Sequence, residues 1–297
     1  MRVPEPIGRP IRISGPQGPW QQLSADLALR GTALVYARSE DWRPQEAAGP
    51  RLRRLLGRDW NRYLDLARPD VRNRFAASRI LLKYAAGEAL QVPPDSVELG
   101  YRTTGRPYLR GNDALDISLS HTDGLLLVGL TTRGFVGVDV EDARREFYEA
   151  GLARHWCTPA ELAWVDALPP ARRDPELVRL WTLKEAYTKA LGLGMQLRFT
   201  DFGFRLDRDP VSVYGVEGQD PGGPGGQLPH GPTGEDGWSF ATFPAGADHT
   251  LSVAVYDAGF GRTEDTAVHT MLETTIVDAV ALVLGEEEQG SGADDAW

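Results

Sequence analysis

Residues 181–194 read WTLKEAYTKALGLG, and this stretch predicts the second half of a long helix around which the chain is organised. The apolar residues recur at helical spacing on one face, at positions 177, 180, 181, 187 and 191. Asp174-Pro175-Glu176 predicts the start of the helix, with Asp174 as the capping residue and Pro175 in the first helical position. Gly192 and Gly194 predict its end, so we expect a helix over 175–191 with one buried face.

Two charged residues of this helix are candidates for chemistry. At about 100° per residue, Glu185 lies at the edge of the apolar stripe, and Lys189 follows one turn later on the same side. The chain has only three lysines, and two of them, Lys184 and Lys189, fall here. A Glu/Lys pair four residues apart is also a common surface pair, worth a few tenths of a kcal/mol. The choice between the two interpretations depends on a second acidic cluster upstream.

That second cluster is the predicted strand FVGVDVE at 135–141. Its residues alternate, so the valines face one way while Gly137, Asp139 and Glu141 face the other. The two carboxylates lie about 6.6 Å apart along the strand, and they could converge on one small cation. Oxygen ligands suit Mg²⁺ or Mn²⁺ better than zinc, and we expect Gly137 to leave room for the cation to approach. The alternative is a half-exposed strand with two solvated acids.

Composition is that of a soluble globular protein. The chain has 297 residues, of which 41% are hydrophobic and 25% charged. No segment approaches the roughly 18 apolar residues of a membrane helix, and we expect neither a signal peptide nor membrane association. Cys157 is the only cysteine, which excludes intrachain disulfides and a cysteine-rich zinc site. We expect a cytoplasmic monomer.

Charge is unevenly distributed along the chain. The net charge of −10 argues against general affinity for nucleic acid. Residues 51–83 nevertheless hold ten basic side chains against three acidic ones. This basic block could bind a phosphorylated small molecule or an acidic partner, or it could be a solvated helix face.

The order of predicted elements repeats along the chain. The first set comprises a strand, helices and three strands, at 31–38, 51–66, 69–90, 96–102, 115–120 and 125–130. The second set follows the same order, at 135–141, 147–168, 175–191, 201–206, 238–243 and 250–256. We therefore predict an α+β (α/β) fold of two similar halves, 1–134 and 135–257, related by a pseudo-two-fold axis. Each half is a small antiparallel sheet packed on a long helix, and the active site is expected in the cleft between them.

Three segments are predicted to lie outside this plan. Residues 1–25 have no clear period and are predicted to form an irregular arm. Residues 218–234 contain seven glycines and four prolines, which predicts a flexible insertion. Residues 258–297 are predicted to form an extension, with a possible helix over 264–284 and a disordered acidic tail over 286–297.

A polar motif precedes the acidic strand. Residues 116–122 read DISLSHT, and Gly105-Arg106-Pro107 lies just upstream. Ser120, His121 and Thr122 at a strand end supply hydrogen-bond donors for phosphate oxygens. A serine nucleophile with a neighbouring histidine base is disfavoured, because adjacent strand residues point to opposite faces.

Together these motifs resemble the Sfp-type 4′-phosphopantetheinyl transferases. The motifs are GVDVE at 137–141, WTLKEAYTK at 181–189 with Gly192-x-Gly194, and SLSHT at 118–122, and Gly105-Arg106-Pro107 matches the family's Gly-(Lys/Arg)-Pro. The resemblance covers about residues 31–257. It implies transfer of phosphopantetheine from coenzyme A to a serine of an apo acyl or peptidyl carrier protein, with release of 3′,5′-ADP. It also implies the two-half fold.

The resemblance implies a role for each matched residue. Asp139, Glu141 and Glu185 would hold Mg²⁺, for which Mn²⁺ can substitute, on the pyrophosphate. Lys189 would contact the same phosphates and steady the leaving group, and Glu185 would take the proton from the carrier serine directly or through water. The coenzyme A contacts would come from six residues: Arg74, Arg106, Ser120, His121, Lys184 and Lys189.

The carrier partner is expected at the segment after the acidic strand. His155-Trp156 stands where many family members have paired phenylalanines. The segment combines basic and apolar groups, which suits an acidic amphipathic carrier helix: Arg144, Arg145, Phe147, Leu152 and Trp156. Alternatively, Phe147 and Trp156 are core residues.

Two other functions remain open. One is a different Mg²⁺-dependent enzyme that acts on a nucleotide pyrophosphate. The other is a non-catalytic module that binds carrier proteins, which the retained acids and lysines disfavour. The sequence does not distinguish fatty acid, polyketide and nonribosomal peptide synthesis as the pathway of the carrier.

Overall fold

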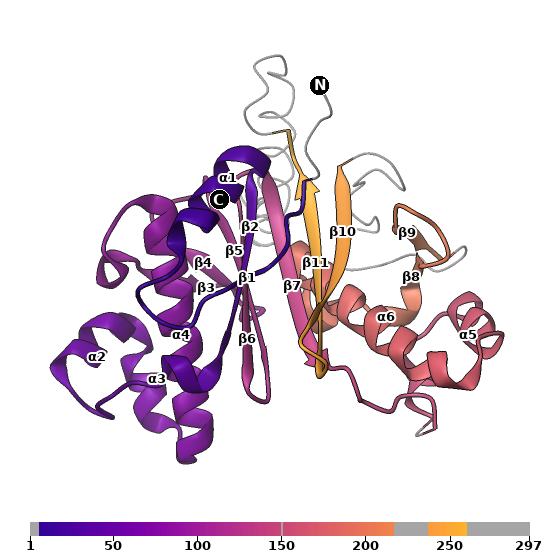
Figure 1. Cartoon of the computed structure of the whole chain (residues 1–297), viewed down its shortest axis with the longest axis horizontal. Helices are drawn as coiled ribbons and strands as arrows, with labels where there is room; N and C mark the ends of the chain where they lie inside the picture. The colour runs from indigo at the N-terminus through magenta and orange to yellow at the C-terminus, as the bar shows by residue number, and fades with distance from the viewer. Residues whose placement is uncertain (1–5, 150, 217–236, 260–297) are drawn as a thin grey trace, which may run out of the picture.

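A computed structural model describes residues 6–149, 151–216 and 237–259. Two small sheets face each other at the centre, with helices on both outer sides (Figure 1). This arrangement confirms the predicted α+β class. No helix among the described residues is long and apolar enough to cross a membrane. The predicted insertion at 218–234, the helix at 264–284 and the tail at 286–297 lie outside the described residues.

The first sheet has four strands with helices on its outer side. In sheet order the strands are β1 (Ile11–Arg12), β2 (Thr32–Arg38), β6 (Leu125–Thr131) and β5 (Asp116–Thr122). The α-helices are α1 (Trp20–Arg30), α2 (Pro50–Leu56), α3 (Trp60–Asp65) and α4 (Pro69–Leu90). Three 3₁₀ turns and one hairpin complete this part: η1 (Ser39–Trp42), η2 (Gly57–Asp59), η3 (Pro94–Ser96), β3 (Leu99–Tyr101) and β4 (Pro107–Leu109).

The second sheet has three strands and is covered by the long helix that contains residues 181–191. In sheet order the strands are β10 (Trp238–Ala245), β11 (His249–Asp257) and β7 (Gly134–Asp142). The helices are α5 (Pro159–Asp166) and α6 (Pro170–Leu191). The remaining elements are η4 (Leu152–His155), η5 (Gly194–Gln196), η6 (Phe199–Asp201), β8 (Phe202–Arg205) and β9 (Ser212–Gly215).

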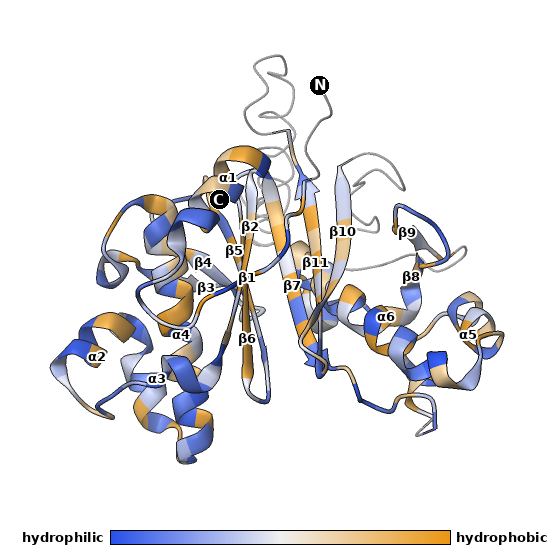
Figure 2. Ribbon diagram, viewed as in Figure 1, coloured by the Kyte–Doolittle hydropathy of each residue, from blue (hydrophilic) through white to orange (hydrophobic). Residues whose placement is uncertain are grey.

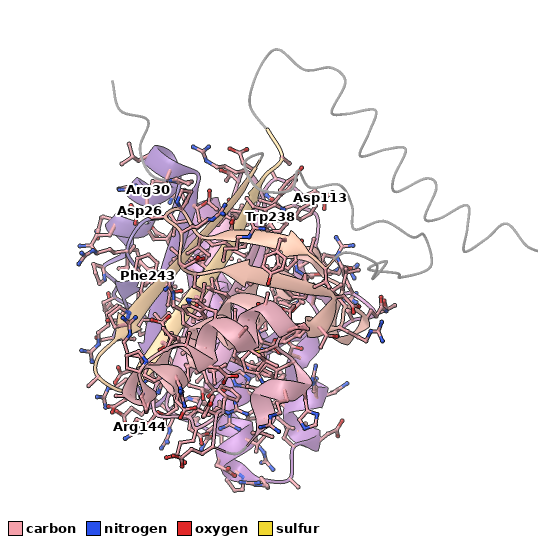
Figure 3. All side chains as sticks on the ribbon, turned by 90° about the vertical axis from the view of Figure 1, so that its right-hand side faces the viewer. Asp26, Arg30, Asp113, Arg144, Trp238 and Phe243 are labelled. Atoms are coloured by element: carbon pink, nitrogen blue, oxygen red, sulfur yellow. The ribbon has the colours of Figure 1, made fainter. Side chains whose placement is uncertain are left out.

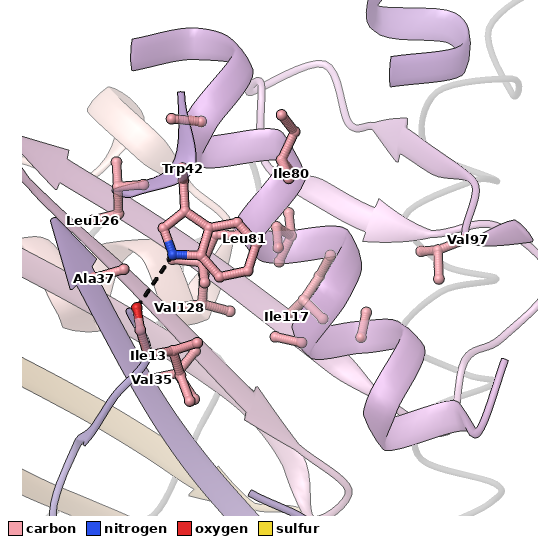
Figure 4. Close-up of a cluster of buried hydrophobic side chains, with 14 of the residues drawn as sticks. Ile13, Val35, Ala37, Trp42, Ile80, Leu81, Val97, Ile117, Leu126 and Val128 are labelled. Atoms are coloured by element: carbon pink, nitrogen blue, oxygen red, sulfur yellow. Dashed lines mark hydrogen bonds between the residues drawn. The ribbon is translucent and has the colours of Figure 1, made fainter. Parts of the chain in front are cut away.

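Three hydrophobic clusters hold these layers together. One lies between α4 and the first sheet, where the Trp42 indole donates to the Ile13 carbonyl at 3.2 Å (Figure 4). A second lies under α6. The third lies between the two sheets, and it contains Val136, Val138 and Val140 of β7. Hydrophobic residues accordingly run along the central strands in Figure 2. The valines therefore face the opposite sheet, as the alternation of residues 135–141 predicts.

The strands β4 and β9 are absent from the sequence predictions, and two boundaries also differ. The predicted irregular arm over 1–25 is wrong in part, because it contains β1 and the first turns of α1. Helix α6 begins at Pro170, not after Asp174, and Pro175 lies inside it. The Asp174 carboxylate accepts the backbone N–H groups of Phe147 and Tyr148, each at 2.7 Å, so it does not cap α6. The predicted end of α6 is confirmed, because Gly192 adopts a left-handed conformation directly after Leu191.

Candidate active site

The candidate site lies where the edge strands β5 and β7 meet. Side chains of β5 take up backbone N–H groups of β7: Asp116 accepts from Val136 at 2.8 Å, and Ser118 accepts from Val138 at 3.1 Å. Strand periodicity places Ser120 next in this row. Its hydroxyl donates to the Asp139 carboxylate at 2.7 Å. The row at 116, 118 and 120 therefore joins the two sheets and brings Ser120 to the acidic strand.

Gly137 brings helix α6 close to β7. A Cβ added at Gly137 would lie 1.8 Å from the Ala186 carbonyl oxygen and 2.5 Å from the Ala190 nitrogen. Only glycine permits helix and strand backbones to approach so closely. This contact corrects the sequence interpretation, in which Gly137 left room for a cation. The glycine instead allows α6 to place Glu185 and Lys189 beside Asp139.

Lys189, Ser120 and Asp139 form one hydrogen-bonded cluster. The Lys189 Nζ lies 2.6 Å from Asp139 Oδ1 and donates to Ser120 Oγ at 3.1 Å. The Ser120 hydroxyl therefore accepts from the ammonium and donates to the carboxylate. Asp139 and Ser120 are buried. Residues from β5, β7 and α6, separated widely in sequence, are thus brought together as the motifs predict.

The other two carboxylates border this cluster. Glu141 forms an ion pair with Arg145, and its Oε1 accepts the Asp142 N–H at 2.9 Å. Among the described residues, Glu185 forms no ion pair. Burial raises the pKa of Glu185, Lys189 opposes this, and the negative charges of Asp139 and Glu141 add to the rise. The three predicted carboxylates therefore sense one another electrostatically.

A metal-binding arrangement is not formed by these side chains as they stand. No group of three His, Cys, Asp or Glu residues within the described ranges is arranged to hold a metal ion. Asp139 and Glu141 are each paired with a basic side chain instead. The donor chemistry nevertheless fits a hard cation, because all three groups are carboxylates.

A basic cluster lies beside the acidic one. Partial withdrawal from water lowers the pKa of His121, and the positive charges of Arg74, Arg79 and Lys189 lower it further. The His121 residue as a whole remains exposed. Arg74 also pairs with the exposed Asp123 at 2.7 Å. Such a cluster favours anions. It contains the predicted Arg74 and His121.

Arg79 is a member of this cluster that sequence reasoning missed. Its Nε donates to the Tyr101 hydroxyl at 2.9 Å, and the Tyr101 hydroxyl donates to Asp59 at 2.6 Å. The guanidinium also lies 4.6 Å from the centre of the Phe75 ring. Helical periodicity places Arg79 on the covered side of α4, but no motif distinguishes it from the other arginines of the basic block.

Arg106 has a different position from the one expected. Its Nη2 donates to Asp116 at 2.6 Å and to the Val136 carbonyl at 3.0 Å, and its side chain is only 9% exposed. Nε is buried without a hydrogen-bond partner. Burial raises the pKa of Asp116, and Arg106 opposes the rise. Arg106 therefore joins β5 to β7, and its burial and its pairing with Asp116 disfavour the expected direct contact with coenzyme A.

Lys184 does not face the cluster, and the expected phosphate contact is incompatible with its position. Its side chain is fully buried. The ammonium lies 2.8 Å from Glu161 and donates to the carbonyls of Phe199 at 2.6 Å and Phe202 at 2.8 Å. Glu161 in turn accepts the Phe204 N–H at 2.8 Å. Burial lowers the pKa of Lys184, and the charge of Glu161 opposes this. Through these contacts the pair connects α5 and β8 to α6.

The predicted carrier surface is only partly exposed. Phe147 and Trp156 are buried core residues, so the apolar part of that prediction is wrong. Their rings pack against each other with centroids 5.3 Å apart. Arg144 remains 71% exposed and lies at the rim of the molecule (Figure 3). Leu152 is 43% exposed.

A cavity of about 540 Å³ adjoins the basic cluster at Arg74. The N-terminus of α4, the end of β2, the β5–β6 turn and the β10–β11 turn enclose it, so both halves contribute. Its basic lining residues are Arg12, Arg38, Arg43, Arg74 and His249, and its acidic ones are Glu40, Asp70, Asp123 and Asp248.

Comparison with known proteins places this site in a family. The sequence model of the 4′-phosphopantetheinyl transferase superfamily matches residues 135–251. A phosphopantetheinyl transferase of Thraustochytrium sp. is 30% identical over 195 residues, which cover 60% of this chain and 67% of the relative. The chain belongs to the 4′-phosphopantetheinyl transferase superfamily.

Other superfamily members match shorter segments. The 4′-phosphopantetheinyl transferase HetI of Nostoc sp. is 34% identical over 130 residues, which cover 43% of this chain and 55% of HetI. A 4′-phosphopantetheinyl transferase of Bacillus subtilis is 24% identical over 143 residues, covering 48% of this chain and 62% of the relative. The chain thus spans about half the length of HetI.

Membership of the superfamily confirms the resemblance inferred from the motifs. The matched residues 135–251 include Asp139, Glu141, Glu185 and Lys189. The remaining members of the site, Ser120 and the basic cluster, lie before the matched region. They reach it through the junction of β5 with β7.

Proposed function

We propose that this protein transfers 4′-phosphopantetheine from coenzyme A to a serine of an apo acyl or peptidyl carrier protein. Superfamily membership supports the reaction class. The observation that carries the proposal is the junction of acidic and basic clusters at Lys189, whose Nζ lies 2.6 Å from Asp139. Phosphoryl transfer requires positioning and charge neutralisation more than a protein nucleophile, and this junction supplies both signs of charge.

Asp139, Glu141 and Glu185 would hold Mg²⁺, for which Mn²⁺ can substitute. Bound there, the cation would neutralise charge on the pyrophosphate and polarise its phosphoryl oxygens. The all-carboxylate donor set supports this assignment. The Lys189 ammonium on Asp139 also indicates that positive charge is stabilised at this position.

The reaction requires one bond to form and one to break. The carrier serine oxygen bonds to the β-phosphorus of coenzyme A, the bond to the bridging oxygen breaks, and 3′,5′-ADP leaves with the electron pair. We assign the serine proton to Glu185, directly or through water. The position of Glu185 supports this role, because its carboxylate lies beside Asp139 and Glu141 and, among the described residues, no ion pair occupies it. Lys189 would neutralise the charge that develops on the leaving group.

Coenzyme A would bind along the basic cluster. Arg74 and His121, together with Arg79, would attract its phosphates, and Ser120 would contribute a hydroxyl beside Asp139. The cavity next to Arg74 supports this placement, since it could accommodate part of the nucleotide. Arg106 and Lys184 would act indirectly, by fixing β7 and α6.

The carrier would dock beside the acidic strand. Arg144, Arg145 and Leu152 are the exposed basic and apolar groups that remain from the predicted surface. Charge complementarity with an acidic carrier helix supports this face. We expect a cytoplasmic monomer that needs neither nucleic acid nor a membrane.

We also propose that residues 1–134 and 135–257 are related by duplication. With β1 set aside, which adds a parallel edge to the first sheet, each half pairs its first strand with its last, in the orders β2-β6-β5 and β7-β11-β10. Each half also contains a hairpin in which a glycine faces a tyrosine, Gly100 with Tyr108 and Gly203 with Tyr214. A Cβ on either glycine would lie 2.3 Å from the tyrosine ring, so the same packing solution occurs twice.

Mass spectrometry of a carrier protein tests the proposed reaction. The purified protein is incubated with coenzyme A, Mg²⁺ and a panel of acyl and peptidyl apo-carriers. We expect a carrier to gain the mass of phosphopantetheine, and we expect Glu185→Gln to abolish this gain while the circular dichroism spectrum stays unchanged. If the whole panel remained unmodified, the proposed activity would be refuted.

A further inference from the structure

Arg145 makes contacts that its expected place on the carrier surface does not explain. Its guanidinium forms an ion pair with Glu141 through Nη1. It also lies over two aromatic rings, 4.7 Å from the centroid of Phe147 and 5.6 Å from that of Trp181. Trp181 lies one turn before Glu185 on α6. The guanidinium is therefore held between a carboxylate of the candidate site and two aromatic rings, one of which lies on the helix that carries Glu185.

This environment differs from that of the neighbouring arginine. Arg144 is 71% exposed and pairs with Asp142, outside the acidic cluster. The Arg145 side chain is 43% exposed, whereas the Glu141 side chain is only 14% exposed. An arginine that stacks on aromatic rings loses little further freedom when it binds an anion. Arg145 is thus oriented in advance, with part of its surface still accessible.

We propose that Arg145 is an active-site counter-ion that exchanges Glu141 for the anionic substrate. While it pairs with Glu141, it neutralises one of the three carboxylates and competes with a divalent cation for that group. When a pyrophosphate enters, its oxygens offer the guanidinium a more highly charged partner, and Glu141 becomes free to bind the cation. The inference rests on the proposed function, since it assigns the anion to the pyrophosphate of coenzyme A.

The proposal predicts two opposite effects of Arg145→Ala, one on cation binding and one on turnover. Loss of the guanidinium should leave Glu141 more available to a cation, because a positive charge beside the site has been removed. Loss of the same group should slow transfer, because it no longer neutralises phosphate charge. A residue that only stabilises the fold would not tighten cation binding. The combination of tighter binding and slower turnover therefore identifies the exchange.

Titration with Mn²⁺ followed by electron paramagnetic resonance measures the first effect without any reaction. In the absence of coenzyme A, we expect Arg145→Ala to bind Mn²⁺ about three- to fivefold more tightly than wild type, the size expected for a half-exposed ion pair. Arg145→Lys keeps the charge and should bind Mn²⁺ as wild type does. Arg172→Ala is the matched control, since Arg172 pairs with the mostly buried Glu176 at the same i,i+4 spacing but outside the cluster. We expect its Mn²⁺ affinity to be unchanged.

Turnover at saturating Mg²⁺ measures the second effect. We expect Arg145→Ala to lose at least about tenfold in kcat, and Arg145→Lys to recover part of it, because lysine restores the charge without the planar fork. Weaker Mn²⁺ binding by Arg145→Ala would overturn the proposal and make Arg145 a support for Glu141. Unchanged Mn²⁺ binding would reduce it to a surface pair, and a change confined to the KM for carrier would make it a docking residue. Failure of the wild-type protein to modify any carrier refutes the proposed function, whereas the Mn²⁺ titration still tests the competition with Glu141.

Discussion

Gly137 allows a single methyl group to test how the site is assembled. In Gly137→Ala, the new Cβ would lie 1.8 Å from the carbonyl oxygen of Ala186 and 2.5 Å from the nitrogen of Ala190. Both contacts are with backbone atoms, so no rotation of a side chain relieves them. An ordinary carbon–oxygen contact is about 3.4 Å, and α6 would have to move away from β7 by roughly 1.5 Å.

That movement should reduce both stability and activity. Overpacking of this kind costs about 1–3 kcal/mol, occasionally more, and each kcal/mol lowers the Tm of a protein of this size by about 2–4 °C. We therefore expect Tm to fall by about 2–12 °C. The 2.6 Å contact between Lys189 and Asp139 spans the same helix–strand interface. A displacement of about 1 Å in such a site reduces turnover by about 100-fold, so activity should fall by at least that factor at a temperature where the variant remains folded.

Gly203→Ala is the matched control. Its added methyl group would lie 2.3 Å from the ring of Tyr214, away from the carboxylate cluster. Calorimetry should find both variants destabilised, while transfer to the carrier, assayed well below both values of Tm, should be lost only in Gly137→Ala. Wild-type turnover in Gly137→Ala, or equal losses of turnover in the two variants, would refute the idea that this glycine positions the active site.

Three further predictions concern the supporting charges. Lys184→Met should reduce the free energy of unfolding by about 3–5 kcal/mol, because it leaves the buried Glu161 carboxylate without its ion pair. Adding Glu161→Gln should restore part of that free energy. Lower affinity for coenzyme A at an unchanged Tm would instead place Lys184 in the binding site. The pKa of His121 is lowered in the folded protein, so its contribution to stability is lost as pH falls through 6.5 toward the folded value. His121→Gln should therefore lose less stability than wild type between pH 8 and pH 5.5 in thermal melts. Calorimetry should also detect more proton uptake on coenzyme A binding in wild type than in this variant. Arg106→Ala should lower Tm, with partial recovery in the double variant Arg106→Ala/Asp116→Asn, and a full loss of coenzyme A affinity without a change in Tm would contradict its supporting role.

Local sequence patterns predicted the frame of the fold and the centre of the site. The alternation of residues 135–141 indicates β7, and the glycines after Leu191 indicate the end of α6, because both signals depend only on neighbouring residues. The spacing of Glu185 and Lys189 on a helix places them on one side. The motifs then indicated that this side meets Asp139, a contact over 50 residues that periodicity alone does not provide.

The errors share a physical cause, since they depend on which surface covers a side chain. Lys184 is about 100° from Glu185 around the helix, and only the packing of α5 and β8 determines that its side is fully buried. The sequence around Phe147 and Trp156 reads the same whether these residues line a partner surface or a core, and only the folded structure shows that they are buried. Asp174 has the sequence context of a helix cap, but a tertiary contact with the segment at Phe147 uses its carboxylate instead.

The junction of the two sheets and the active site are one structure. Edge strands normally expose unpaired backbone groups, and here Asp116 and Ser118 of β5 satisfy two of them on β7 through their side chains. Because strand side chains alternate, the row that makes these bonds must also direct residue 120 toward β7, where Ser120 meets Asp139. A change at Ser118 therefore cannot be purely local, since it alters the register between β5 and β7 on which the contact between Ser120 and Asp139 depends. Catalytic geometry in this protein is thus set by how its halves are joined, and substitutions along that junction should affect turnover before they unfold either half.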